Sequence, residues 1–108
     1  MTSPYYTASD GRRWQIHSVN ALAALLKRAD AAELPAINWT VVGLMEIRGA
    51  VDSLHSDPLG IFHLWAEHLD LEVKPPVRSL DTWRHAALGK AGDIRIHVYV
   101  DVYEEGAK

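Results

Sequence analysis

The segment IRIHVYVDVY, residues 94–103, decides the fold because its apolar and polar residues alternate strictly. Successive side chains of a strand point to opposite faces, so a two-residue period predicts a half-buried strand. One face would carry Ile94, Ile96, Val98, Val100 and Val102. The other face would carry Arg95, His97, Tyr99, Asp101 and Tyr103. We expect the first face to pack on a core and the second to meet solvent or a partner.

The residues before this strand predict its hairpin partner. Residues 80–88 have strand character, and the loop 89–93, GKAGD, is rich in turn formers. A loop of three or five residues places His85 opposite His97 on the outer face, whereas a four-residue loop turns Trp83 and His85 towards the core. The four-residue loop separates polar from apolar side chains better, and we favour it.

Residues 37–51, INWTVVGLMEIRGAV, show the same period with a break in the middle. The pattern predicts a first hairpin whose turn spans residues 43–45. That turn sets Trp39 opposite Gly49, where the missing side chain leaves room for an indole ring.

Residues 57–72, DPLGIFHLWAEHLDLE, carry the clearest helix signal. Asp57 suits the N-cap and Pro58 the first helical position. At 100° per residue the apolar side chains form one stripe for the core, made of Ile61, Phe62, Trp65, Ala66 and Leu69. Polar residues follow the opposite side of the helix.

Another helix is expected at about residues 19–33, with Ser18 as its N-cap and Pro35 beyond its end. Apolar residues recur there at helical spacing, at Val19, Leu22, Leu26 and Ala29.

Two structures are open for the N-terminal residues. Residues 1–11 are rich in Thr, Ser, Pro and Gly and are expected to form a flexible arm. The dipeptide Asp10-Gly11 is also typical of the turn that closes a two-residue hairpin, here over residues 5–16.

The expected elements make one α+β domain over residues 12–104, followed by a polar tail at 105–108. Their order is helix, hairpin, helix, hairpin, with KPPV at 74–77 as a stiff linker before the last hairpin. The simplest packing is a four-stranded antiparallel sheet with both helices on one face. A chain of 108 residues suits one core of this size.

Charge and composition narrow the partners. The formal net charge is −3, which disfavours nucleic acid as a partner, because a global attraction to phosphates is missing. The chain has no cysteine and no apolar stretch of about 18 residues, so we expect a cytoplasmic protein without a membrane partner.

The histidines do not predict a metal site. The densest group is HLWAEH at 63–68, but His63 and His68 lie five residues apart, about 140° around a helix. Motifs of nucleophilic enzymes and phosphate-binding loops are missing as well. We therefore expect no cofactor and no metal, and an enzyme only as a distant alternative with His97 as general base.

The outer face of the sheet is the candidate binding site. Its candidate residues are Arg48, Arg95, His97, Tyr99 and Tyr103. Arginine and tyrosine are enriched at the cores of protein interfaces, although they are also common on half-exposed sheets. We expect a small non-enzymatic binding or regulatory module that uses this face or a sheet edge, with an unknown protein partner or a second copy. The alternative is nucleic-acid binding by the same arginines and tyrosines.

A strand with Trp39, a strand with Gly49 and a helix with Trp65-Ala66 follow one another between residues 37 and 72. This order resembles a pattern in small uncharacterised proteins of actinobacteria and their phages. The resemblance covers about a third of the chain and rests on core positions, so it implies a fold and no activity.

Overall fold

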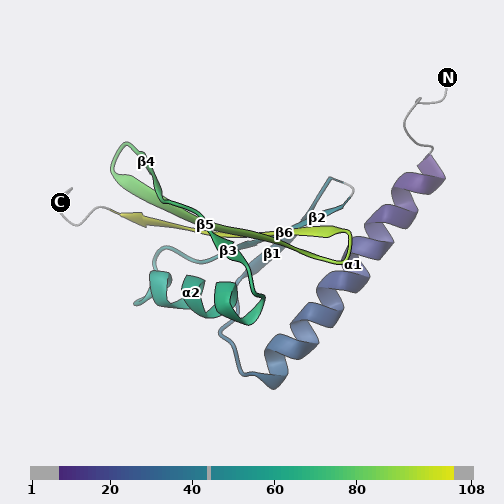
Figure 1. The fold of residues 1–108 in the computed structure, drawn as a ribbon, viewed down its shortest axis with the longest axis horizontal. Helices are drawn as coiled ribbons and strands as arrows, with labels where there is room; N and C mark the ends of the chain where they lie inside the picture. Colours follow the sequence, from purple (N-terminus) through teal and green to yellow (C-terminus); the bar gives the residue numbers. More distant parts are fainter. Residues whose placement is uncertain (1–7, 44, 104–108) are drawn as a thin grey trace.

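The computed structural model describes residues 8–43 and 45–103. These residues form two helices and an open mixed sheet of six strands in an α+β arrangement, with both helices on the same side of the sheet (Figure 1). The elements along the chain are α1 (Ala8–Ala31), β1 (Asn38–Val42), β2 (Glu46–Ala50), α2 (Pro58–His68), β3 (Glu72–Val73), β4 (Val77–Ser79), β5 (Thr82–Ala91) and β6 (Ile94–Tyr103).

The predicted four-stranded antiparallel sheet is wrong in its strand count and in one pairing. The strand order is β1-β2-β6-β5-β3, with β4 also paired to β5. The β5–β6 hairpin is inserted so that β6 lies beside β2, and these two strands run parallel. The physical reason lies in the segment between α2 and β5, which forms two short strands at the edge of the sheet.

The sequence predicts a helix segment up to residue 72 and a linker at 74–77, but α2 ends at His68 and residues 72–79 carry the chain along the outer edge of β5. Both β3 and β4 pair antiparallel with β5, and the backbone N–H of Lys74 donates to the carbonyl of Ala86 at 2.8 Å between them. Pro75 and Pro76 separate the two strands because proline has no N–H to donate. Because this segment runs antiparallel to β5, the chain reverses its direction before β5 begins. As a result, β6 runs parallel to β2.

The first hairpin has the predicted register. Trp39 pairs with Gly49 and Val42 with Glu46, so the connection spans residues 43–45. Gly43 has a φ of 59°, a left-handed conformation that glycine adopts without steric cost. The predicted pairing of an indole with a glycine is confirmed.

The second hairpin turns Trp83 and His85 towards the core, as favoured, but its loop is shorter than expected. Ala91 pairs with Ile94, so the turn contains only Gly92 and Asp93, and β5 extends to residue 91. Gly92 has a φ of 62°. Two residues, like the four of the favoured loop, are an even number, so both loops give the strands the same facing. Trp83 and His85 therefore lie on the same face as the core valines of β6.

Helix α2 begins as predicted and provides much of the core. The side chain of Asp57 accepts a hydrogen bond from the backbone N–H of Gly60 at 3.1 Å, and Pro58 is the first helical residue. Ile61, Phe62, Trp65 and Ala66 are buried against the sheet. The indole of Trp65 donates to the carbonyl of Pro35 at 2.8 Å, which ties α2 to the segment after α1.

Helix α1 differs most from the prediction. It begins eleven residues before the expected start, so residues 8–16 are helical and the hairpin over residues 5–16 is wrong. The last four residues of the predicted arm, 8–11, are also helical, and the rest of that arm and the polar tail lie outside the described residues. Ser18, the expected N-cap, is a fully buried residue in the middle of the helix.

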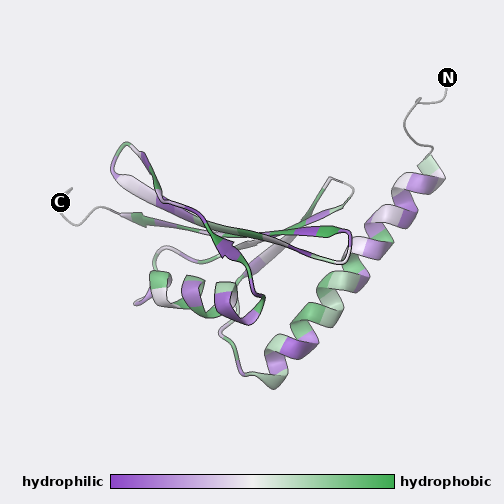
Figure 2. Cartoon of the chain, in the orientation of Figure 1, coloured by the Kyte–Doolittle hydropathy of each residue, from purple (hydrophilic) through white to green (hydrophobic). Residues whose placement is uncertain are grey.

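The core lies between the helices and one face of the sheet. Its members on the strands are Ile47, Ala87, Ile94, Ile96, Val98 and Val100. Polar and apolar residues alternate along β6, and the strand registers place its polar residues on the face opposite the helices. Figure 2 shows the hydropathy of each residue along the strands. No helix in the described part of the chain is long and apolar enough to cross a membrane.

Candidate functional site: the open face of the sheet

One face of the sheet is not covered by either helix, and we call it the open face. The strand registers place on it one residue in two from each long strand. Its charged and aromatic members are Glu46, Arg48, Arg84, Lys90, Arg95, His97, Tyr99, Asp101 and Tyr103. All five candidate residues from the sequence therefore share one surface.

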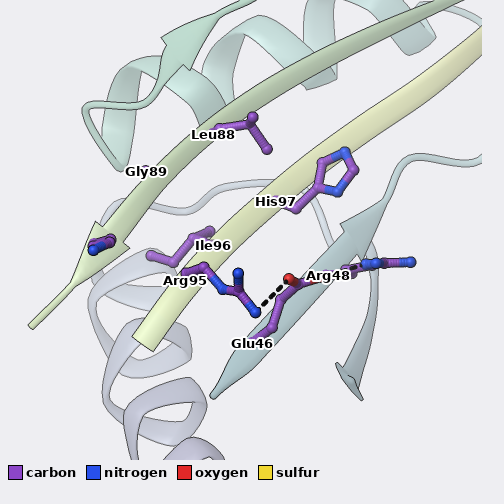
Figure 3. Close-up of a pocket in the computed structure, with 8 residues that line it drawn as sticks. Glu46, Arg48, Leu88, Gly89, Arg95, Ile96 and His97 are labelled. Atoms are coloured by element: carbon purple, nitrogen blue, oxygen red, sulfur yellow. Dashed lines mark hydrogen bonds and ion pairs between the residues drawn. The ribbon is translucent and has the colours of Figure 1, made fainter. Parts of the chain in front are cut away.

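A single carboxylate organises one end of the open face. Glu46 on β2 pairs with Arg95 on the parallel neighbour β6, and its side chain is largely buried. The Nε of Arg48 donates to one oxygen of Glu46 at 2.5 Å, and Arg95 Nη2 lies 3.6 Å from the other oxygen. Figure 3 shows Glu46 between the two arginines. Glu46 thus restricts two guanidinium groups that would otherwise move freely on the surface.

A second cluster lies further along β6, where this strand pairs with β5. Arg84 pairs directly with Asp101 across β5 and β6, and its Nε and Nη2 donate to the two carboxylate oxygens at 2.7 and 2.8 Å. The guanidinium also stacks on the ring of Tyr99, 4.6 Å from the ring centre. The hydrogen bonds from Arg84 lower the pKa of Asp101, and those to Asp101 raise the pKa of Arg84. A bidentate pair of this kind has a defined geometry.

His97 lies between the two clusters. Arg48 is its neighbour on β2 and Leu88 its neighbour on β5, and its ring centre is 5.4 Å from that of Tyr99. The Nε2 atom is buried and has no hydrogen-bond partner among the described residues. Burial lowers the pKa of the imidazole, the positive charge of Arg48 lowers it further, and Glu46 acts in the opposite direction. The net lowering of the pKa favours the neutral form of the imidazole.

A depression of about 380 Å³ opens on this face beside His97. It lies across the ends of β2, β6 and β5, and Figure 3 shows the side chains around it. Its lining combines charged groups with one exposed apolar side chain, and it consists of Glu46, Arg48, Leu88, Gly89, Lys90, Arg95, Ile96 and His97. Such a mixture of an apolar contact and fixed polar groups is typical of binding sites.

The structure divides the predicted site residues into two groups. Arg48, Arg95 and His97 line the depression, whereas Tyr99 and Tyr103 lie further along β6 and do not. The prediction omitted Glu46, Leu88 and Lys90. Lys90 was missed because residues 89–93 are predicted as a loop, whereas β5 continues to Ala91.

The open face is locally basic although the chain is acidic. Arg48, Arg84, Lys90 and Arg95 face two carboxylates, those of Glu46 and Asp101. A third carboxylate, that of Glu72 on the edge strand β3, shares this face because Glu72 pairs with Leu88, and it is itself paired with Lys74 at 3.0 Å. The local field therefore attracts an anionic group, in contrast to the net charge of −3.

No group of three or more histidine or acidic side chains within residues 8–43 and 45–103 is arranged to hold a metal ion. His63 and His68 are both exposed on α2, on different sides of the helix. The chemistry that the open face offers is hydrogen bonding, charge pairing and stacking.

Comparison with known proteins gives no relative from which a function can be transferred. No family model, curated protein or solved structure matches the chain.

Proposed function

We propose that this protein is a small non-enzymatic binding module that recognises a protein partner through its open face. The observation that carries the proposal is the pair of arginines held by Glu46 beside His97 and the depression. Arginine and tyrosine are the residues that contribute most at interface cores. The absence of cysteine in the sequence supports a cytoplasmic setting.

The arrangement of these side chains lowers the entropic cost of binding. A free arginine loses much rotamer freedom when it is ordered in an interface, about 0.5–1.5 kcal/mol for each side chain. Arg48 and Arg84 are already held by Glu46 and Asp101. Each guanidinium has five N–H donors, so donors remain for a partner after the internal pair is made.

The charge of the face favours an acidic partner segment. Apart from the Glu72–Lys74 pair at the sheet edge, four cations surround two carboxylates, and Lys90 lines the depression without a described ion-pair partner. A partner carboxylate that entered the depression would meet Arg48, Arg95 and Lys90, while Leu88 would contact an apolar side chain next to it. We therefore propose a peptide segment that carries an acidic and an apolar residue.

The sheet edges are less suited to this role. The edge formed by β3 and β4 is interrupted by Pro75 and Pro76, which prevent continuous pairing with another strand. The edge strand β1 has only five residues. Binding through the face is therefore the version of the module that we favour.

Two other functions have less support from the same geometry. Base stacking on Tyr99, as required for nucleic-acid binding, competes with the guanidinium of Arg84 that already covers the ring. Catalysis with His97 as general base requires a nitrogen that reaches a substrate, and Nε2 of this ring is buried.

The proposal is tested by affinity capture from lysate of the native host. The bait proteins are the wild type, the triple variant Arg95→Ala/Tyr99→Ala/Tyr103→Ala and a control variant Glu67→Ala/His68→Ala on the exposed side of α2. Recovered protein and nucleic acid are quantified separately. Since Tyr99 stacks with Arg84, the double variant Arg95→Ala/Tyr103→Ala, which changes only exposed side chains, is included to guard against loss of folding.

The expected result is a protein species recovered with wild type and control and lost with both open-face variants. Purified, this species should bind less tightly as salt is raised, because charge pairs contribute to the contact. Equal recovery with all four baits would refute the proposal. Nucleic acid lost with the open-face variants would instead support the alternative function.

A further inference from the structure

Helix α1 carries a second apolar stripe that faces solvent. Leu25 and Ala29 are buried against the sheet, and Ser18 lies on the same side of the helix. The second stripe is centred about 120° away at 100° per residue. It consists of Ile16, Val19, Ala23 and Leu26, and the three larger side chains are 60%, 51% and 41% exposed. We call these four residues the outer stripe.

The spacing of the outer stripe is that of a helix-pairing seam. The intervals between its members are three, four and three residues, the alternation found at the a and d positions of coiled coils. The stripe is about 15 Å long at 1.5 Å per residue. The greenest turns of α1 lie in its central part, and purple residues lie on either side of them (Figure 2). Neither Val19 nor Leu26 is buried, so α1 carries more apolar surface than the sheet covers.

Opposite charges continue the same seam at its two ends. Arg12 lies four residues before Ile16, and Asp30 lies four residues after Leu26. Both side chains are exposed, and neither has a side-chain hydrogen bond or ion pair with the described residues. Asp30 is in the last turn of the helix, where the helix dipole disfavours a carboxylate. The helix itself gives no reason for this placement.

We propose that the outer stripe binds the outer stripe of a second copy of this chain, with the two α1 helices antiparallel. In that arrangement Ile16 meets Leu26, Val19 meets Ala23 and Arg12 meets Asp30, and the two-fold axis repeats every contact. A parallel arrangement would bring Arg12 to Arg12 and Asp30 to Asp30. The opposite charges at the two ends of the seam therefore favour a second copy of this chain as the partner and an antiparallel direction of the two helices.

The surroundings of the stripe permit this contact. The N-terminal turns of α1 extend away from the sheet (Figure 1). Arg13 and Lys27 border the outer stripe on the side away from the sheet. Their like charges oppose association, but their long side chains can extend into water at the margin of the contact. The open face lies on the other side of the sheet, so a dimer leaves both open faces free and this inference is independent of the proposed function.

Sedimentation equilibrium of the full chain, from low micromolar to submillimolar concentrations, measures the association. The wild type is expected to show a monomer–dimer equilibrium. Val19→Glu buries a carboxylate in the seam and should weaken the dimer at least about tenfold, since unpaired buried charge is costly. Val19 is half exposed in the monomer and glutamate is a better helix former, so the variant should remain folded.

Charge reversal tests the direction of the helices. Arg12→Asp alone and Asp30→Arg alone each place like charges together in the antiparallel dimer and should weaken it. The double variant Arg12→Asp/Asp30→Arg restores both pairs and should restore the affinity of the wild type. In a parallel dimer no such rescue occurs, because each residue meets its own copy.

Circular dichroism melts establish that every variant is folded. Three results would overturn the proposal: a wild type that stays monomeric over the whole range, a dimer unaffected by Val19→Glu, or a double reversal that fails to restore association. The second result would indicate a dimer made by a sheet edge instead.

Discussion

Trp39 lies directly across from Gly49 in the β1–β2 pair, and its indole fills the space that a side chain at residue 49 would occupy. A Cβ at Gly49 would come 3.0 Å from the Trp39 ring and 2.7 Å from Cδ1 of Ile37. The same indole meets the ring of Trp65 edge-on, with centres 5.4 Å apart. This glycine therefore allows α2 and the first hairpin to pack together.

The first prediction concerns this contact. Gly49→Ala should lower the free energy of unfolding by about 1–3 kcal/mol, because the added methyl group overpacks the site. Urea unfolding followed by tryptophan fluorescence measures the change. Thr40→Ala, on the exposed side of β1, is the control and should change stability by less than about 0.5 kcal/mol. Equal stability of Gly49→Ala and wild type would show that the indole moves away without cost.

The second prediction concerns the β4–β5 turn. Leu80 has a φ of 55° and is 91% exposed, so it adopts a left-handed conformation and buries almost nothing. Leu80→Gly should raise the free energy of unfolding by up to about 1 kcal/mol, because it relieves this strain. Leu54→Gly is the matched control, since Leu54 is also highly exposed but has no positive φ, and it should be neutral or slightly destabilising. A loss of stability in Leu80→Gly would contradict the strain.

The third prediction concerns the protonation of His97. Its pKa should lie below the ordinary value of about 6.5 in an NMR titration of the imidazole, because the ring is partly buried. Arg48→Ala should raise this pKa and Glu46→Gln should lower it further, since the two neighbours act in opposite directions. Shifts of the same sign in both variants would refute the assignment of these causes.

The lowered pKa of His97 also predicts how stability depends on pH. Near pH 6 the unfolded chain binds a proton at this residue more readily than the folded protein does. Stability should therefore fall as the pH drops from 7 through the lowered folded pKa. His97→Gln should reduce this fall relative to wild type in urea midpoints measured at pH 7 and pH 5.

The fourth prediction concerns the pair of Arg84 and Asp101. The pKa of Asp101 is lowered in the folded protein, so the stabilising effect is complete above the unfolded pKa of about 4 and is lost as the pH falls through the folded value. Asp101→Asn should cost about 0.2–1 kcal/mol at pH 7, as for other solvent-exposed pairs, and less at pH 2. Urea unfolding at both pH values measures the difference, and an equal cost at both would show that the ion pair contributes nothing.

The elements predicted correctly have strong local signals. Asp57 and Pro58 mark the start of α2, and the break at Gly43 sets the register that pairs Trp39 with Gly49. The start of α1 was missed because Asp10-Gly11 is common in turns, and the helix runs through both residues. The parallel pairing of β2 with β6 has no local signal at all, since it joins segments almost fifty residues apart and depends on where β3 and β4 lie.

The candidate site likewise has one part with a local sequence signal and one part that depends on distant segments. The two-residue period places Arg95, His97, Tyr99 and Tyr103 on one face, and the structure agrees with that placement. The role of Glu46 could not be predicted, because it depends on β6 lying beside β2. Local alternation thus identifies the face, and the topology decides which of its charges interact.

The central position of β6 also has a consequence for how the chain folds as it is synthesised. This strand supplies Ile94, Ile96, Val98 and Val100 to the core, and it is the last of the elements to be translated. The strands β2 and β5 flank it and are not paired with each other. On the ribosome, α1, the first hairpin and α2 must therefore wait with an incomplete core until residue 103 has emerged, which makes nascent chains of this protein candidates for chaperone binding.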